Sequence, residues 1–190
     1  DGTWQTGESP ITYNNIFFGE TYDASLKPVW RRAEIHGAPN ARLEIQLSPA
    51  DRVTEEITPS EVCENTYDAG KVISGFASVA CRGNVGDEIE IYYSECINDD
   101  GTLNFTSTVG YESSDKFQIQ KDKFILSGNG IEVYTPHFVW HGFRYFRIAA
   151  KSAEIVGVKV CSVHSAVEKR AVFECSDKLF NKIHGMYLNS

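Results

Sequence analysis

"KVISGFASVACRGNVGDEIEIYYSECI", residues 71–97, places two strand-like runs on either side of a glycine-containing turn. In the second run apolar and polar residues alternate, which puts Ile89, Ile91 and Tyr93 on one face of an extended chain. The first run is rich in β-branched and small apolar residues, and residues 84–88 supply the Gly and Asp of a turn. The stretch therefore predicts a β-hairpin with one buried face.

Similar patterns continue toward the N-terminus. A strand is expected to run to a turn at Gly19, an extended piece follows Pro28, and residues 36–41 read as a loop. Two further strands, joined by a short turn at 48–51, are expected after that loop. Their inward-facing side chains are predicted to be Leu43, Ile45, Leu47, Val53 and Ile57.

Toward the C-terminus an Asp-Gly turn at 100–101 is followed by a polar stretch, 105–116, which predicts a long loop. Three apolar, β-branched or aromatic regions come next and predict strands. They span residues 117–128, 131–150 and 153–165.

Many short strands with frequent turns predict an all-β fold, specifically an antiparallel β-sandwich of the jelly-roll type. Helical spacing is confined to the C-terminus, where Leu179, Phe180, Ile183 and Tyr187 form one apolar stripe. Ser176 and Asp177 precede this stripe and can cap the start of a helix. We therefore expect a sandwich followed by one short helix.

The composition and net charge of the chain argue against two classes of partner, nucleic acids and membranes. The chain has 190 residues, 42% of them apolar, which is enough for one sizeable core. A net charge of −8 without a Lys/Arg-rich run argues against nucleic acid as a partner. No run approaches the roughly 18–20 apolar residues needed to cross a bilayer, and no secretory signal opens the chain, so no membrane partner is expected.

The five cysteines are widely spaced, with no CxxC pair and no Cys/His cluster at zinc spacing, so cysteine predicts no metal site. Cys81, Cys96 and Cys161 lie in strand-like runs, where a free cysteine usually behaves as a small buried apolar residue. One disulfide among the five stays open as an alternative.

The densest aromatic stretch, "FVWHGFRYFRI" at 138–148, supports two interpretations. In the first, Trp140, His141, Arg144 and Tyr145 form a sugar-contacting platform, with the tryptophan stacked on a pyranose. In the second, the aromatics are core and the polar side chains bond neighbouring loops. Alternation puts Phe138 and Trp140 on one face, and the glycine at 142 permits a bulge that resets the register. Residue types alone favour the core interpretation, because aromatic strands are commoner in cores than in sites.

Carboxylates are plentiful, but no pair carries a catalytic signature. "GETYD" at 19–23 is the most concentrated case, with Glu20 and Asp23 on either side of a tyrosine just after a turn. Glycoside hydrolysis needs two carboxylates at defined separation, and turn-capping carboxylates give the same local pattern. A nucleophile elbow, a phosphate-binding glycine loop and an HExxH helix are missing from the sequence. We therefore expect no catalytic residue in this chain.

Several stretches of the chain form an ordered set of motifs: "DGTWQTGESPITYNNIFFGETYDASL", "PADRVTEEITP", "YDAG", "GNVGDEIEIYYSECINDDGTLN", "PHFVWHGFRYFRI" and "VHSAVEKRAVFECSDKLFNKIHGMYLNS". Taken in this order, they resemble the non-catalytic β-rich part of bacterial α-L-rhamnosidases. In that family a module ending in GETYDAR-like residues precedes a concanavalin-like β-sandwich, which leads into an α/α-barrel catalytic domain. The chain departs from the family pattern at Lys71 and Val72, where a Gln-Asn pair is common, and at Trp140, where tyrosine is common.

This resemblance implies a place within a larger bacterial hydrolase that removes terminal α-L-rhamnose with inversion, using carboxylates on the downstream barrel. It also implies three parts: residues 1–30 as the tail of a preceding β module, 31–170 as the sandwich, and 171–190 as a helix leading toward the barrel. The compartment, cytoplasmic or exported, stays open.

Two functions remain as hypotheses. In one, the sandwich supports the catalytic barrel of its own chain. In the other, it is a carbohydrate-binding module that contacts rhamnose-containing sugars through Trp140, Arg144, Glu20 or Asp23. No cofactor is expected, although a calcium ion near Glu20 and Asp23 would fit the second hypothesis, because sugar-binding sandwiches commonly carry one.

Overall fold

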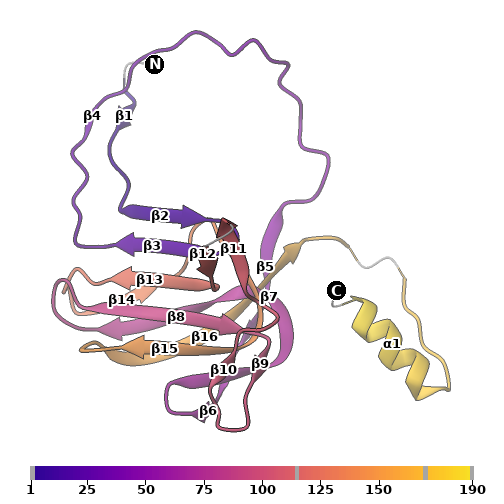
Figure 1. Cartoon of the computed structure of the whole chain (residues 1–190). Coiled ribbons are helices and arrows are strands. Elements are labelled where there is room, and N and C mark those ends of the chain that lie inside the picture. The colour runs from indigo at the N-terminus through magenta and orange to yellow at the C-terminus, as the bar shows by residue number, and fades with distance from the viewer. Residues whose placement is uncertain (1–2, 114–115, 169–170, 189–190) are drawn as a thin grey trace.

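The computed structural model describes residues 3–113, 116–168 and 171–188. Within them the chain is mostly β structure, with a short helix near its C-terminus (Figure 1). The strands are β1 (Gln5–Thr6), β2 (Ile11–Asn15), β3 (Gly19–Asp23), β4 (Arg31–Arg32), β5 (Asp51–Ile57), β6 (Ser60–Cys63), β7 (Thr66–Arg82), β8 (Glu88–Ser94), β9 (Cys96–Ile97), β10 (Leu103–Asn104), β11 (Gly110–Ser113), β12 (Lys116–Gln118), β13 (Lys121–Ile125), β14 (Ile131–Tyr134), β15 (His141–Ala150) and β16 (Glu154–Ser165), and the helix is α1 (Lys178–Leu188).

Most strands belong to one curled sheet with the order β2-β3-β13-β8-β15-β7-β16-β5, to which β14 and β6 are added beside β7. Figure 1 shows β2, β3, β13, β8 and β15 lying side by side. Strands β3 and β13 are parallel, whereas the other described pairs are antiparallel. The predicted all-β sandwich with a short C-terminal helix is confirmed.

The long strand β7 turns the single sheet into two layers. Its first half pairs with β15 on one edge and β6 on the other, and its second half pairs with β14 and β16. The change occurs at Gly75, which is the register partner of both His141 and Ser162. A strand that leaves one layer for the other makes the corner of a sandwich.

The core is formed by side chains from both layers. Ile89, Ile91 and Tyr93 are fully buried, which confirms the face predicted from their alternation. They pack in one cluster with aromatic and aliphatic residues of β7, β14, β15 and β16. Burial of this apolar surface is the main stabilising contribution, at roughly 25 cal/mol per Å².

The hairpin predicted for residues 71–97 is wrong. The turn before β8 exists, with the Asp87 amide donating to the Asn84 carbonyl at 3.1 Å, but β15 lies between β7 and β8. The connection therefore crosses from one layer to the other. Local alternation identifies the two strands but not the strand that lies between them, β15, which is formed by residues 141–150.

The prediction for residues 42–62 is confirmed only for the existence of its second strand, β5. Val53, which was expected to face inward there, is 48% exposed, and Ile57 is half-buried. Leu43, Ile45 and Leu47 lie outside any strand and are 88%, 87% and 96% exposed. Figure 1 shows the segment before β5 arching away from the sheet. The alternating apolar side chains of Leu43, Ile45 and Leu47 therefore have no surface to pack against within the described residues.

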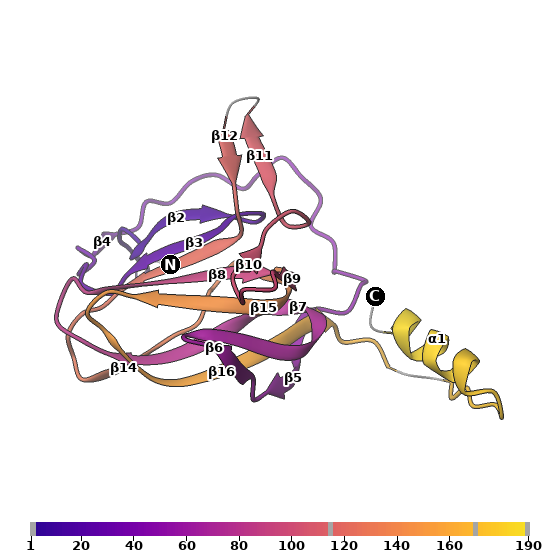
Figure 2. The same ribbon diagram turned by 60° about the horizontal axis from the view of Figure 1, so that its bottom comes forward.

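Three smaller predictions need correction. Within the predicted loop 105–116 lie β11 and the start of β12, and the predicted strand 117–128 is divided between β12 and β13. The β11–β12 pair projects from the sheet in Figure 2, and residues 114–115 lie outside the described residues. The region 131–150 is two strands separated by a loop. Cys96 is exposed, whereas Cys81 and Cys161 are buried as expected, and all five cysteines are free.

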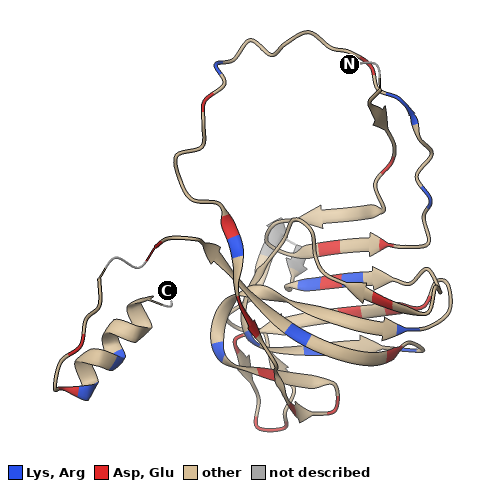
Figure 3. Ribbon diagram, turned by 180° about the vertical axis from the view of Figure 1, so that it is seen from behind, with Lys and Arg blue, Asp and Glu red and all other residues tan. Residues whose placement is uncertain are grey.

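The helix α1 begins where expected, because the Asp177 carboxylate accepts the Leu179 amide at 2.8 Å. Among the described residues no helix has the length and apolarity needed to cross a bilayer. Lys and Arg are interspersed with Asp and Glu along the described strands (Figure 3), in agreement with the lack of a basic run in the sequence.

Candidate functional site

A buried carboxylate, Asp122 on β13, connects three strands of the sheet. It is fully buried and accepts hydrogen bonds from the Glu20 amide (2.9 Å), the Tyr93 hydroxyl (2.9 Å) and His141 Nε2 (3.1 and 3.2 Å). Burial, and then the charge of Asp122, hold the pKa of the Tyr93 hydroxyl well above its usual value. A buried carboxylate is tolerated when it is fully hydrogen-bonded in this way.

Gly19, the first residue of the GETYD stretch, permits this contact. Its φ is +124°, and a Cβ there would lie 1.9 Å from the Lys121 carbonyl oxygen and 2.8 Å from Asp122 Oδ1. Only glycine fits such an approach. The GETYD and HGFRY stretches, more than a hundred residues apart, therefore meet at Asp122 (Gly19 and Glu20 on one side, His141 on the other).

His141 is a buried residue of β15. Its ring stacks on that of Tyr93 with centroids 4.3 Å apart, and Nε2 faces Asp122. With Nε2 facing Asp122, the second ring nitrogen, Nδ1, is buried and has no hydrogen-bond partner.

Glu20 is a second buried carboxylate. It accepts the His137 amide at 3.1 Å and faces His137 Nδ1 at 2.9 Å and the Tyr134 hydroxyl at 3.4 Å. Asp23 lies at the opposite parity on β3 and accepts the Ser25 amide at 2.9 Å. The two carboxylates predicted as a calcium or sugar site thus lie on opposite faces of the strand, and the described residues hold no group of three His, Cys, Asp or Glu suited to a metal ion.

Arg144 ties the HGFRY strand to the "YDAG" stretch of β7. Its guanidinium binds both carboxylate oxygens of Asp68 at 2.8 Å and lies 4.9 Å from the centroid of the Tyr145 ring. The predicted register change falls here, between Phe143 and Tyr145, rather than at Gly142. The hydrogen bonds from Arg144 hold the pKa of the Asp68 carboxyl below its usual value.

The ion pair between Arg144 and Asp68 is expected to stabilise the fold by an amount that depends on pH. Because the pKa of Asp68 is lowered in the folded state, the contribution is complete above the unfolded pKa of about 4 and is lost as pH falls through the folded value. Urea unfolding should show that Arg144→Gln destabilises the chain at pH 6 and that the difference shrinks at pH 3. Arg82→Gln, which removes an ion pair more than half exposed on both sides, is the control and should cost little at either pH. A difference for Arg144→Gln that is independent of pH would contradict this assignment.

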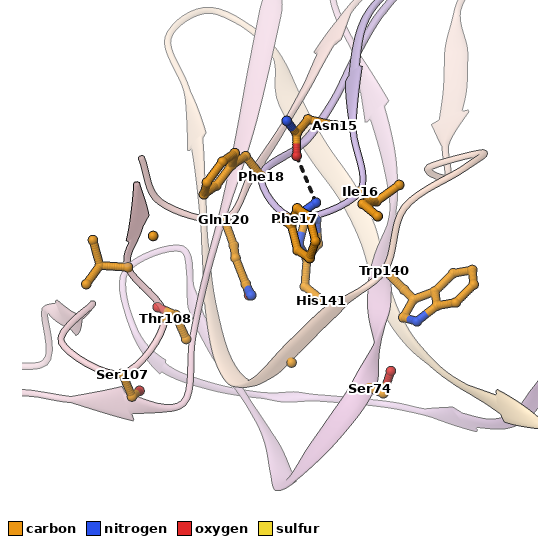
Figure 4. A pocket seen from close by; sticks show the side chains of 13 residues that line it. Asn15, Ile16, Phe17, Phe18, Ser74, Ser107, Thr108, Gln120, Trp140 and His141 are labelled. Carbon is orange, nitrogen blue, oxygen red and sulfur yellow. Dashed lines mark hydrogen bonds between the residues drawn. The ribbon is translucent and has the colours of Figure 1, made fainter. Parts of the chain in front are cut away.

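Trp140 is the most exposed of the predicted sugar-contacting residues, at 44%. It lines an open cleft of about 790 Å³ formed by the β2–β3 turn, residues 107–110, Gln120 and the start of β15. Figure 4 shows Phe17, His141, Gln120 and Thr108 near one another, with Trp140 at the edge of the cleft and its ring directed away from them. Arg144, Tyr145, Glu20 and Asp23 do not line it.

Of the predicted site residues, Trp140 is therefore the one that is exposed. Glu20 and His141 are buried, and Asp23 and Arg144 are held by hydrogen bonds to neighbouring groups. Asp122, Asp68 and the cleft residues Thr108 and Gln120 were missed. A signal for Asp122 was present, because it shares the parity of Phe124 and Leu126, which places a carboxylate on an inward face.

Comparison with known proteins places these features in a family. Residues 60–167 match the model of the bacterial α-L-rhamnosidase concanavalin-like domain. An α-L-rhamnosidase of Formosa agariphila is 28% identical over 98% of this chain, and one of Streptomyces avermitilis is 26% identical over 95%. The chain spans 21% and 19% of these relatives.

Solved structures of α-L-rhamnosidases contain a region with the same fold as this chain. The structure of α-L-rhamnosidase from Dictyoglumus thermophilum matches all of this chain with a TM-score of 0.81 and 31% identity, over 23% of its own length. That of native α-L-rhamnosidase from Aspergillus terreus matches with a TM-score of 0.79 and 25% identity, again over 23% of its length.

Proposed function

Because the chain belongs to the bacterial α-L-rhamnosidase concanavalin-like domain family, we propose that it is a non-catalytic part of a larger α-L-rhamnosidase and supports that enzyme's catalytic helical barrel. The whole enzyme would remove terminal α-L-rhamnose with inversion. The share of the curated relatives that the chain spans, about a fifth, leaves room for such a barrel elsewhere in the protein. The division proposed is residues 1–30 as the end of a preceding module, 31–170 as the sandwich and 171–190 as the connection to the barrel.

The observation that carries the supporting role is the unburied apolar face of α1. The helix buries none of its residues within the described chain. Five of its apolar side chains are more than half exposed, namely Leu179, Phe180, Ile183, Met186 and Tyr187. A helix with such a stripe gains most of its stability by packing against another element. We assign that element to the barrel of the same protein.

The carboxylates of the chain favour a non-catalytic role. Glu20 is buried and hydrogen-bonded to His137, and Asp23 caps a turn. The two therefore do not form the pair of substrate-accessible carboxylates that glycoside hydrolysis requires. A second candidate function, contact with rhamnose-containing sugars, is favoured by the exposure of Trp140 beside the cleft.

The supporting role predicts different effects of one double variant in two contexts. In the 190-residue chain, Leu179→Ser with Ile183→Ser should change the free energy of unfolding by less than about 0.5 kcal/mol, because both side chains are exposed. In the full-length protein the same change should lower the melting temperature and the hydrolysis of an aryl α-L-rhamnoside. The 190-residue chain alone should not hydrolyse that substrate.

The control is Lys182→Ser, an exposed polar position on the same helix, which should be neutral in both contexts. If the double variant leaves the full-length protein unaffected, α1 does not contact the barrel. If the 190-residue chain hydrolyses the substrate, the non-catalytic assignment is wrong.

A further inference from the structure

The cleft beside Trp140 contains an unusual set of polar atoms. Among the described residues, three buried side-chain polar atoms have no hydrogen-bond partner: Thr108 Oγ1, Gln120 Oε1 and His141 Nδ1. All three belong to residues that line this one cleft. Folded proteins satisfy nearly all buried polar groups, so the gathering of three exceptions in one place calls for polar partners in the cleft, supplied by water or by a ligand.

The three residues converge from separate parts of the chain. Thr108 lies in the loop before β11, Gln120 precedes β13, and His141 begins β15. His141 is held in place by Asp122 and is 1% exposed. Thr108 and Gln120 are half-buried and line the cleft, and we expect a change of side-chain rotamer to turn their polar atoms toward it. Figure 4 shows these side chains around the same opening.

The chemistry of the lining points to a neutral ligand. Among the lining residues that the structure describes, none is Lys, Arg, Asp or Glu, so this lining offers neither a counter-charge for an anion nor a carboxylate for a cation. Gln120 Oε1 accepts hydrogen bonds, the Thr108 hydroxyl both donates and accepts, and His141 Nδ1 is a further ring nitrogen that can form one. Polar atoms of this kind match a ligand that carries several hydroxyl groups.

The rim of the cleft adds apolar surface. Trp140 is 44% exposed and Phe17 is 67% exposed, and both line the cleft. A cleft of about 790 Å³ is within the range of roughly 300–1,000 Å³ found for small-molecule sites. An aromatic surface beside hydroxyl-binding groups suits the flat apolar face of a pyranose ring.

We propose that this cleft is a binding site for a neutral saccharide, with Trp140 as the stacking surface and Thr108, Gln120 and His141 as hydrogen-bond partners of its hydroxyl groups. The proposal rests on the second candidate function, sugar contact, and is independent of the supporting role of the sandwich. Of the residues predicted from the sequence it keeps Trp140 and His141, whereas Glu20, Asp23, Arg144 and Tyr145 take no part in it.

The test is a calorimetric and fluorescence titration of the 190-residue chain with L-rhamnose and a panel of neutral mono- and disaccharides. We expect saturable binding by at least one of them. Trp140→Ala and Thr108→Val should each weaken that binding at least about tenfold, which corresponds to about 1.4 kcal/mol. The matched controls are Trp30→Ala, an exposed tryptophan outside the cleft, and Thr106→Val, an exposed threonine of the same loop.

Thr108→Val separates a binding role from a structural one. Replacing a buried hydroxyl without a partner by a methyl group of the same shape should leave stability unchanged or raise it, while binding falls. The proposal is overturned if no sugar binds up to about 50 mM, or if Thr108→Val and Trp140→Ala bind as well as the unchanged chain. Neither result would bear on α1, because the titration uses no barrel.

Discussion

Replacement of Asp122 by alanine should destabilise the chain by about 3–5 kcal/mol, one of the two largest effects that we expect from a single substitution. The carboxylate is fully buried and accepts from the Glu20 amide, the Tyr93 hydroxyl and His141 Nε2. Its removal leaves three donors without a partner in an apolar interior, and each such donor costs about 1–3 kcal/mol. Urea unfolding monitored by circular dichroism measures the loss directly.

The control for Asp122 is Asp99→Ala, an exposed residue of the turn between β9 and β10, which should cost less than about 0.5 kcal/mol. A loss below about 1 kcal/mol for Asp122→Ala would mean that the buried polar contacts do not hold the strands together, and the structural account of both sequence stretches that meet there would fail.

The second large effect is expected for Gly75→Ala. At this corner of β7 a Cβ would lie 2.0 Å from the Cys161 carbonyl oxygen and 3.1 Å from Ser162 Cα. These atoms are backbone of the paired strand β16, so the clash cannot be relieved by a side-chain rotation. We expect a loss of more than about 3 kcal/mol, or failure to fold, in thermal and urea unfolding.

Gly142→Ala is the matched comparison, because Gly142 also lies in a central strand and a Cβ there meets nothing within 4 Å. It should be neutral or slightly stabilising, since alanine restricts the unfolded chain. Equal effects of the two substitutions would show that the two layers do not approach closely at Gly75.

The sequence predicted the strands better than their arrangement. Alternation placed Ile89, Ile91 and Tyr93 in the core because each strand has one buried face, and this property is local. The hairpin prediction failed because pairing is not local, and β15 is supplied by a distant part of the chain. The same limit applies to Leu43, Ile45 and Leu47, whose pattern is that of a strand although no partner strand exists in the described residues.

The site was predicted only in part, for a related reason. Residue types indicated that the GETYD and HGFRY stretches carry polar groups of importance, but not that these groups face each other through Asp122 and are buried. The core interpretation holds for His141, Phe143 and Phe146, whereas Trp140 is partly exposed. Which residues of an aromatic strand reach solvent depends on the neighbouring strands, which the local sequence does not specify.

Heat inactivation of the full-length protein tests the central claim, that this sandwich supports a rhamnosidase barrel, most directly. The measurement is loss of aryl α-L-rhamnoside hydrolysis with temperature, for the unchanged sequence and for Asp122→Ala, beside the melting temperature of the 190-residue chain with the same substitution. We expect both temperatures to fall together, by roughly 10 °C, while KM at low temperature is unchanged. If the sandwich melts earlier and the inactivation temperature of the enzyme does not change, the sandwich does not support the barrel.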